Sequence, residues 1–406
     1  MFSRATLAGR TAHAQYAIRE LFLAAERLER AGAKIAKVNI GDPVPYFGTP
    51  EYVREALYRA EKEGKTGYGR SPGEKPFLEA IARRYRRKFG VEIDPDRIFA
   101  TQGVSEAIQF LDMCLMERGR GAVVFAPFYP TYVPKVLLYG GEPVLPMCDE
   151  ERGWAPDAED LRKKIAEAKA KGLDLKYLLL INPCNPTGSL WSGKELEVVA
   201  EVAKDNDLLL VSDEIYDEIV FSGERFESMA AVAKDIPHVI LNGLSKGWCA
   251  TGLRIGWMIV EGEGRACEEL RDALTRLGTL RLCPNIPAQH AGVIALENEK
   301  AHREFLRGFN AEIKKRSEFM WKRLNEIPGV SCQRAGGAFY LFPKIDIARA
   351  SCRTDSEFVR RLLEKEKVWA VQGSGFGVEG HIRIVTLPPI ETLEQAAHGI
   401  ERMMKG

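Results

Sequence analysis

Residues 244–256 read LSKGWCATGLRIG and place Lys246 eight positions before Arg254. This layout is typical of a lysine that carries a cofactor as an imine, with an arginine close by to hold a phosphate of that cofactor. A lone lysine before a glycine-rich turn would indicate little, because most lysines are solvated and most glycines serve turns. The interpretation therefore depends on the segments around it.

Apolar runs alternate with helical patterns on both sides of this stretch. Such alternation predicts an α/β fold, with a mainly parallel sheet covered by helices on both faces. Functional groups in such folds gather at the carboxyl ends of the strands, so residues that follow the runs are expected to share one crevice. The runs are 122–125, 177–181, 208–211 and 239–241, and the last three precede Asn182, Asp213 and the lysine stretch.

Three further segments have suggestive composition: 182–188 read NPCNPTG, 212–216 read SDEIY, and Arg383 stands in the run HIRIV at 381–385. With the lysine stretch, and in this order, they resemble the fold-type I pyridoxal-phosphate (PLP) aminotransferases of class I/II over nearly the whole chain. Four other motifs resemble the alanine aminotransferase branch in particular: YAIR at 16–19, NIGDP at 39–43, LRLCPNIPAQ at 280–289 and GGAFY at 336–340.

The resemblance implies a large PLP-binding domain at 50–286 and a smaller α+β domain built from 16–49 and 287–406, after an N-terminal arm at 1–15. The sequence itself changes character after about Pro287. The expected elements there are a long charged helix at 299–325, a strand at 338–343 after a glycine turn, and a last helix from Glu391.

Composition narrows the class of protein. The 406 residues are 45% hydrophobic with a net charge of +1, which gives no reason to expect nucleic acid or an anionic membrane as partner. The basic run at 83–88 is interpreted as the solvated face of a helix whose buried stripe is Phe77, Ile81, Tyr85 and Phe89.

Cysteine and histidine usage points the same way. The eight cysteines are scattered without a Cys-x-x-Cys pair, which favours free thiols in a reducing cytoplasm. The six histidines show no metal-ligand spacing, so we expect no metal site. No apolar run approaches the roughly 20 residues that span a bilayer, so no membrane segment is expected.

Three residues are candidates for the catalytic chemistry. Lys246 would form the imine and then move a proton between the substrate Cα and the cofactor, because lysine pKa falls readily on burial near other cations. Asp213 ends an apolar strand, and its charge would keep the pyridine nitrogen protonated; alternatively it caps a helix beginning at Glu214. By resemblance, Tyr216 and the Asn185 amide would reach the cofactor's phenolic oxygen.

The phosphate is expected where a strand gives way to a helix, at the backbone N–H groups of Gly103, Val104 and Ser105. The resemblance adds Arg254, and Tyr68 from a neighbouring subunit. Ser245 is a further candidate, because many relatives carry a serine three residues before the lysine where this chain has Gly243. Residues 373–377, GSGFG, are interpreted as a structural turn because they precede a strand.

Aromatic and basic residues complete the expected site. Tyr129 falls at the family's ring-stacking position, with core packing as the alternative. Arg383 stands in an apolar strand, and a buried arginine pairs best with an anion that has two oxygens. By resemblance that anion is the substrate carboxylate, which Asn185 and Gly41 also hold. Tyr16 and Arg19 are the candidates for a second carboxylate, with Arg281 in reserve, and an exposed Arg19 on an ordinary helix is the alternative.

The resemblance thus implies a homodimeric aminotransferase that works by a ping-pong cycle on an L-amino acid and a 2-oxo acid, with alanine and 2-oxoglutarate as the expected pair. Aspartate, branched-chain or aromatic donors stay open, because specificity rests on few contacts. A cystathionine β-lyase type of carbon–sulfur lyase shares the fold and needs no acceptor. The last alternative is the sensory domain of a transcription regulator. Such a regulator requires a helix-turn-helix module before the first motif, and the short N-terminal segment does not favour one.

Overall fold

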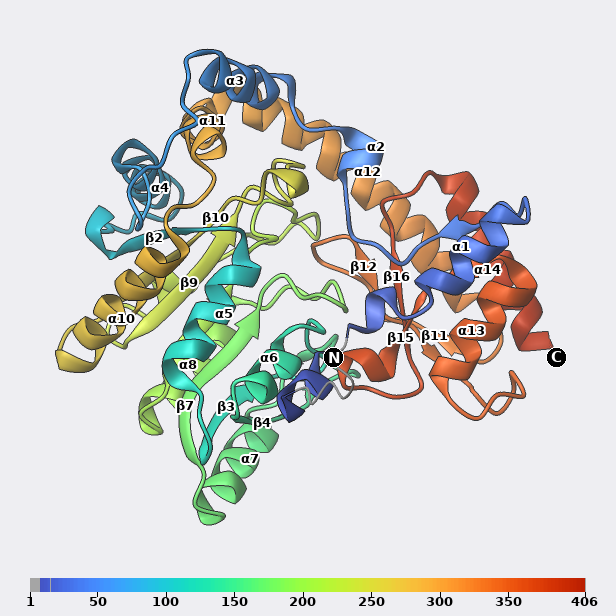
Figure 1. The fold of residues 1–406 in the computed structure, drawn as a ribbon. Coiled ribbons are helices and arrows are strands. Elements are labelled where there is room, and N and C mark those ends of the chain that lie inside the picture. Colours follow the sequence, from blue (N-terminus) through green and yellow to red (C-terminus); the bar gives the residue numbers. More distant parts are fainter. Residues whose placement is uncertain (1–7, 15, 406) are drawn as a thin grey trace, which may run out of the picture.

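One large sheet forms the platform of the protein (Figure 1). The structure, a computed structural model, describes residues 8–14 and 16–405. All neighbouring strands of this sheet are parallel except β10, which runs antiparallel to both of its neighbours. Among the described residues the sheet has seven strands, in the order β2 (Ile98–Thr101), β10 (Gly256–Glu261), β9 (His238–Gly243), β8 (Leu209–Asp213), β7 (Asp174–Ile181), β3 (Arg120–Val124) and β4 (Glu142–Val144).

Helices cover both faces of the sheet, as predicted. Successive residues of a strand point to opposite faces, and both sets are buried: Val123 packs in one apolar core, whereas Ala122 and Val124 pack in the other. This confirms the α/β fold and all four apolar runs. The first core includes residues of α4 (Lys75–Phe89), α7 (Ala158–Ala170), α8 (Gly193–Asp205) and α11 (Ile286–Glu297), and the second includes residues of α5 (Val104–Leu115), α6 (Tyr132–Leu138) and α10 (Arg265–Arg281).

Short elements connect these layers. Helix α3 (Glu51–Lys62) packs on α11. The other connecting elements are α9 (Met229–Val232), the hairpin of β5 (Cys148–Asp149) and β6 (Ala155–Pro156), and the 3-10 turns η1 (Gly9–His13), η2 (Ala17–Arg19), η3 (Pro95–Arg97) and η4 (Thr251–Leu253).

Residues 22–47 and the C-terminal part of the chain form a second group of elements, on the right of Figure 1. Strand β1 (Ala36–Lys37) pairs with β14 (Val368–Trp369), so the N-terminal segment and the C-terminal part share a core. The charged helix predicted at 299–325 is confirmed as α12. The remaining elements are α1 (Phe22–Arg30), α2 (Val44–Phe47), α12 (Glu299–Asn325), α13 (Asp355–Glu366), α14 (Ile390–Lys405), β11 (Val330–Ser331), β12 (Tyr340–Leu341), β13 (Lys344–Ile345), β15 (Val371–Gln372), β16 (Ile382–Val385) and η5 (Gly373–Phe376).

Several expectations are refined. The strand expected at 338–343 is only β12, and the turn at 373–377 closes into the short helix η5 before β16. Of the predicted arm, residues 1–7 and 15 lie outside the described part of the chain. No helix in the described ranges is long and apolar enough to cross a membrane.

The basic run on α4 is only partly a solvated face. Phe77, Ile81 and Tyr85 are buried as predicted, whereas Phe89 is only half-buried. Arg84 is buried too, which the sequence interpretation missed. Its guanidinium pairs with the carboxylates of Asp217 and Glu218. A buried charge needs such partners, because desolvation would otherwise be costly.

Candidate active site

A pocket of about 360 Å³ opens where β7, β8 and β9 end. The polar residues expected from three separate strand ends do converge there, because parallel strands present their carboxyl ends at one edge. Of the candidate residues, the pocket is lined by Tyr16, Arg19, Gly41, Val104, Ser105, Tyr129, Asn185, Asp213, Tyr216, Ser245, Lys246, Arg254 and Arg383.

Lys246 projects into this pocket from the turn after β9. Its Nζ donates a hydrogen bond of 2.6 Å to the Gly41 carbonyl oxygen. Burial lowers the pKa of Lys246 to about 8, opposed by the nearby Asp42 carboxylate and assisted by the cations Arg383 and Arg254. An amine with this pKa is partly uncharged near neutral pH and is therefore available as a nucleophile or base.

Asp213 is the last residue of β8 and is buried. Its Oδ2 accepts a 2.6 Å hydrogen bond from the Tyr132 hydroxyl, and its Oδ1 accepts one from the Ile215 amide. Burial raises the pKa of this carboxyl to about 6, and these hydrogen bonds oppose the rise. No helix begins at Glu214, so the helix-cap alternative is wrong; a turn follows instead.

Arg383 lines the pocket from β16. Its Nη1 donates to Asn185 Oδ1 at 3.0 Å, and its Nη2 donates to the Asn39 carbonyl. The side chain is 1% exposed, yet Nε has no partner among the described residues. A buried, fixed guanidinium with a spare donor fits a carboxylate ligand. Gly41 lies close by, where a Cβ would come within 2.1 Å of the Tyr340 hydroxyl, so only glycine fits.

The expected phosphate end has the predicted strand–turn–helix geometry. Gly103 precedes the first turn of α5 with φ +78°, and a Cβ there would lie 2.4 Å from Arg254 Nη2. Arg254 also donates to the Gln102 carbonyl at 3.1 Å and to the Thr251 carbonyl at 2.9 Å. Its guanidinium therefore lies beside the free N–H groups and the positive dipole end of α5.

Gly243 has a structural reason to lack a side chain. A Cβ there would lie 2.8 Å from the Ile255 carbonyl oxygen and 2.9 Å from the Gly256 Cα. Strands β9 and β10 approach closely where Gly243 pairs with Gly256, so a serine at position 243 does not fit unless the backbone moves. Ser245 is buried and lines the pocket instead.

The remaining candidates lie at the rim or outside the pocket. The Tyr16 hydroxyl lies 3.1 Å from that of Tyr129, and Arg19 is exposed at the pocket edge. Tyr68 is 86% exposed and does not line the pocket. Arg281 is also absent from the lining: its Nη1 pairs with Glu106 at 2.5 Å, which does not favour its reserve role.

Sequence reasoning missed four residues near the site. Asp42 and Tyr340 line the pocket and belong to motifs already noted, NIGDP and GGAFY, which could have identified them. Thr251 donates its hydroxyl hydrogen to Asp42 Oδ1 at 2.9 Å. Tyr132, the partner of Asp213, had no sequence signal beyond its nearness to Tyr129.

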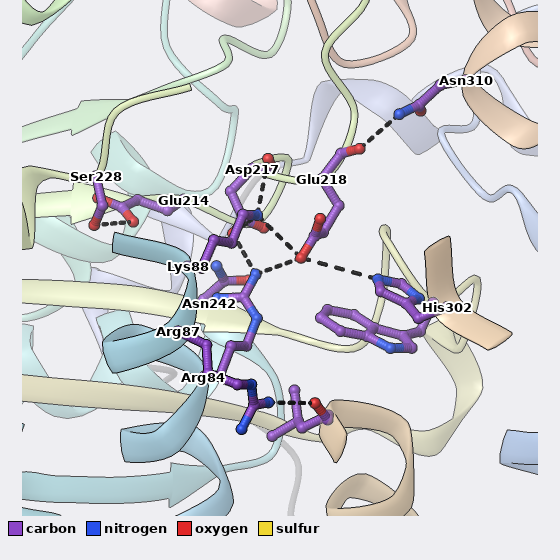
Figure 2. A network of polar contacts seen from close by, with 12 residues as sticks. Arg84, Arg87, Lys88, Glu214, Asp217, Glu218, Ser228, Asn242, His302 and Asn310 are labelled. Atoms are coloured by element: carbon purple, nitrogen blue, oxygen red, sulfur yellow. Dashed lines mark hydrogen bonds and ion pairs between the residues drawn. The ribbon is translucent and has the colours of Figure 1, made fainter. Parts of the chain in front are cut away.

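A buried charge network lies behind the segment that follows Asp213 (Figure 2). Arg84 and Lys88 of α4 both pair with Asp217 and Glu218. Helix α12 adds further contacts: Asn310 donates to the Glu218 carbonyl at 2.8 Å, and His302 stacks on Trp248 with ring centroids 4.4 Å apart. The network thus joins two helices to the segments that carry Tyr216 and Lys246.

Comparison with known proteins agrees with this geometry. Residues 35–400 match the family described as aminotransferase class I and II. The chain is 36% identical to an alanine aminotransferase of Mycobacterium tuberculosis over 93% of this chain and 87% of that protein. It is 35% identical to the glutamate-pyruvate aminotransferase AlaA of Escherichia coli over 94% of this chain and 93% of that protein.

A solved structure is similar over the full length. An alanine aminotransferase from Pyrococcus furiosus superposes with a TM-score of 0.93 at 41% identity, covering 99% of this chain and 100% of that one. Enzymes of this family are PLP-dependent and act on amino acids and 2-oxo acids. The chain therefore belongs to the aminotransferase class I and II family and is a fold-type I, PLP-dependent enzyme.

Proposed function

We propose that this enzyme transfers the amino group between L-alanine and 2-oxoglutarate by a ping-pong cycle. The convergence of Lys246, Asp213 and Arg383 in one pocket carries the proposal. The names of the relatives, alanine and glutamate-pyruvate aminotransferases, support the choice of substrates.

The pocket residues fit the cofactor. PLP supplies an aldehyde that bonds to amines and a pyridine ring that withdraws electrons. Lys246 would hold its aldehyde carbon, Asp213 the pyridine nitrogen, and Tyr129 the ring face. The close approach of the Arg254 guanidinium to Gly103, where a Cβ would lie 2.4 Å from Nη2, is the observation that supports a phosphate against the α5 amides and Arg254. The same end includes Val104, Ser105, Ser245 and, from a neighbouring subunit, Tyr68.

The chain's own residues would then handle protons and charge. The Lys246 amine, once free, would take a proton from the substrate Cα and deliver it to the cofactor's aldehyde carbon; its lowered pKa suits both tasks. The Tyr216 hydroxyl and the Asn185 amide would donate to the cofactor's ring oxygen. Their side chains lie together, with Asn185 Nδ2 3.5 Å from the Tyr216 oxygen.

A second set of pocket residues is proposed to recognise the substrate. Arg383, Asn185 and the Gly41 amide would hold the α-carboxylate that alanine and 2-oxoglutarate share. Tyr16 and the exposed Arg19 would bind the distal carboxylate, which glutamate and 2-oxoglutarate carry and alanine lacks. An exposed side chain suits this task, since it can leave the pocket when alanine binds.

We also infer a cytoplasmic homodimer, in which Tyr68 reaches the neighbouring active site. A second inference is that the chain divides into a large domain at 50–286 and a small domain at 16–49 plus 287–406. The exposure of Tyr68 away from its own pocket supports the first inference. The core that β1 shares with α14 supports the second. The free cysteines among the described residues are compatible with a reducing compartment.

A steady-state assay tests the proposal. The enzyme should form pyruvate from alanine only when 2-oxoglutarate is present, and Lys246→Ala should abolish turnover in a folded protein. Lys315→Ala, an exposed lysine on α12, is the matched control. Faster turnover of aspartate, branched-chain or aromatic donors would keep the mechanism and replace the substrate, whereas pyruvate release from cystathionine without acceptor would indicate the lyase.

A further inference from the structure

Tyr340 occupies a place in the pocket that the proposed function leaves without a task. It begins β12, is 2% exposed and lines the same pocket as Lys246. Its hydroxyl lies 2.8 Å from the Tyr216 hydroxyl. The Arg383 guanidinium carbon lies 4.8 Å from its ring centroid. Tyr340 therefore contacts both the residue assigned to the cofactor's ring oxygen and the residue assigned to the substrate carboxylate.

The backbone fixes this tyrosine against Tyr216. The turn at 336–338, just before it, docks on the segments that carry Asn185 and Tyr216. Amides of the turn donate to the Gly188 carbonyl at 2.8 and 2.9 Å and to the Ile219 carbonyl at 2.8 Å. A Cβ on the second glycine of the turn would lie 2.7 Å from that Ile219 oxygen, so the close approach requires glycine. The contact between the hydroxyls is thus built into the fold.

The hydrogens of the two hydroxyls can be assigned. Burial raises the pKa of Tyr340 to about 12 and the pKa of Tyr216 well above its usual value, so both stay protonated at neutral pH. Each hydroxyl then has one hydrogen to donate. When Tyr216 uses its hydrogen on the cofactor's ring oxygen, its own oxygen can only accept. Tyr340 must therefore be the donor across the 2.8 Å contact.

We propose that Tyr340 is a positioning residue that donates a hydrogen bond to Tyr216 and so strengthens Tyr216 as a donor to the cofactor. The proposal rests on the proposed function and adds a residue to it. Consecutive hydrogen bonds polarise one another, by roughly 10–30% per bond. Stronger donation favours negative charge on the ring oxygen, which makes a proton on the cofactor-bound Lys246 nitrogen easier to remove.

A spectroscopic titration tests this role apart from turnover. The visible absorbance of the bound cofactor is followed against pH in the wild-type holoenzyme, Tyr216→Phe, Tyr340→Phe and the double variant. A hydrogen bond to a charged group corresponds to roughly 1–2 pKa units, so Tyr216→Phe should raise the midpoint by about that much. Tyr340→Phe should raise it by on the order of 0.3 unit, and the double variant should match Tyr216→Phe, because the second hydroxyl acts only through the first.

Tyr177→Phe is the matched control, since it removes another buried tyrosine hydroxyl bond, 2.6 Å to Asp112, outside the pocket. Its midpoint should equal that of the wild type. If Tyr216→Phe raises the midpoint but Tyr340→Phe leaves it at the wild-type value, the proposed role of Tyr340 is overturned. So does a shift that adds fully in the double variant. A wild-type protein without any visible cofactor band would remove the proposed function and this inference together.

Discussion

Arg383 and Arg19, the two arginines assigned to substrate carboxylates, have opposite surroundings. Arg383 is 1% exposed and fixed by hydrogen bonds to Asn185 and Asn39. Arg19 stands exposed at the pocket edge, on the short η2 turn. A rigid site suits the carboxylate that every substrate carries, whereas a movable cation suits a group that only some substrates carry.

Arg19→Ala should therefore separate the two substrates. We expect the KM for 2-oxoglutarate to rise by roughly 10–100-fold, the loss of one charge-assisted hydrogen bond, while the KM for alanine changes little. Initial-rate kinetics with each substrate varied in turn measures both constants. Arg30→Ala, an exposed arginine on α1, should alter neither. An equal loss for alanine and 2-oxoglutarate would remove Arg19 from this role.

Residue-level prediction located pocket residues where the signal along the chain is local. Lys246, Asp213 and Arg383 each follow or interrupt an apolar run, and the structure places all three in one pocket. It could not explain Gly243, because the reason lies in the carbonyl of Ile255 on the neighbouring strand. That close approach exists only after β9 and β10 have paired.

At the scale of elements, helix α12 and the strands β3, β7, β8 and β9 were predicted well because their signals are contiguous. A strand buried on both faces is an unbroken apolar run, and a long helix repeats its pattern over many turns. Helix α4 shows the limit of such patterns. The burial of Arg84 depends on Asp217, 133 residues away, which no periodicity within the helix can reveal.

The buried charge network, in which Arg84 and Lys88 of α4 pair with Asp217 and Glu218, should stabilise the elements that it joins. Arg84→Met leaves the buried Asp217 and Glu218 with too few cations, and breaking a buried pair from one side costs about 3–5 kcal/mol. Urea unfolding of the holoenzyme measures the loss. Arg83→Met, one residue away but with a side chain 44% exposed, should change stability by no more than about 0.5 kcal/mol. Equal stability of the two variants would mean that the network contributes nothing beyond surface pairing.

At the scale of the whole molecule, we propose that each active site takes residues from two subunits. If Lys246 of one subunit works with Tyr68 of its neighbour, a heterodimer of Lys246→Ala and Tyr68→Ala chains has one intact site and one doubly altered site. Unfolding and refolding the two variants together should restore activity well above that of either homodimer. No restoration in verified heterodimers would mean that Tyr68 serves its own subunit or no site at all.

The central claim, amino transfer from alanine through a lysine-bound cofactor, is tested most directly by the half-reaction. Single L-amino acids are added to the purified holoenzyme without acceptor, and the cofactor's visible absorbance is followed with time. We predict fast conversion by alanine and glutamate, slow conversion by aspartate and aromatic amino acids, and recovery of the original spectrum on adding 2-oxoglutarate. No spectral change with any amino acid would contradict the account.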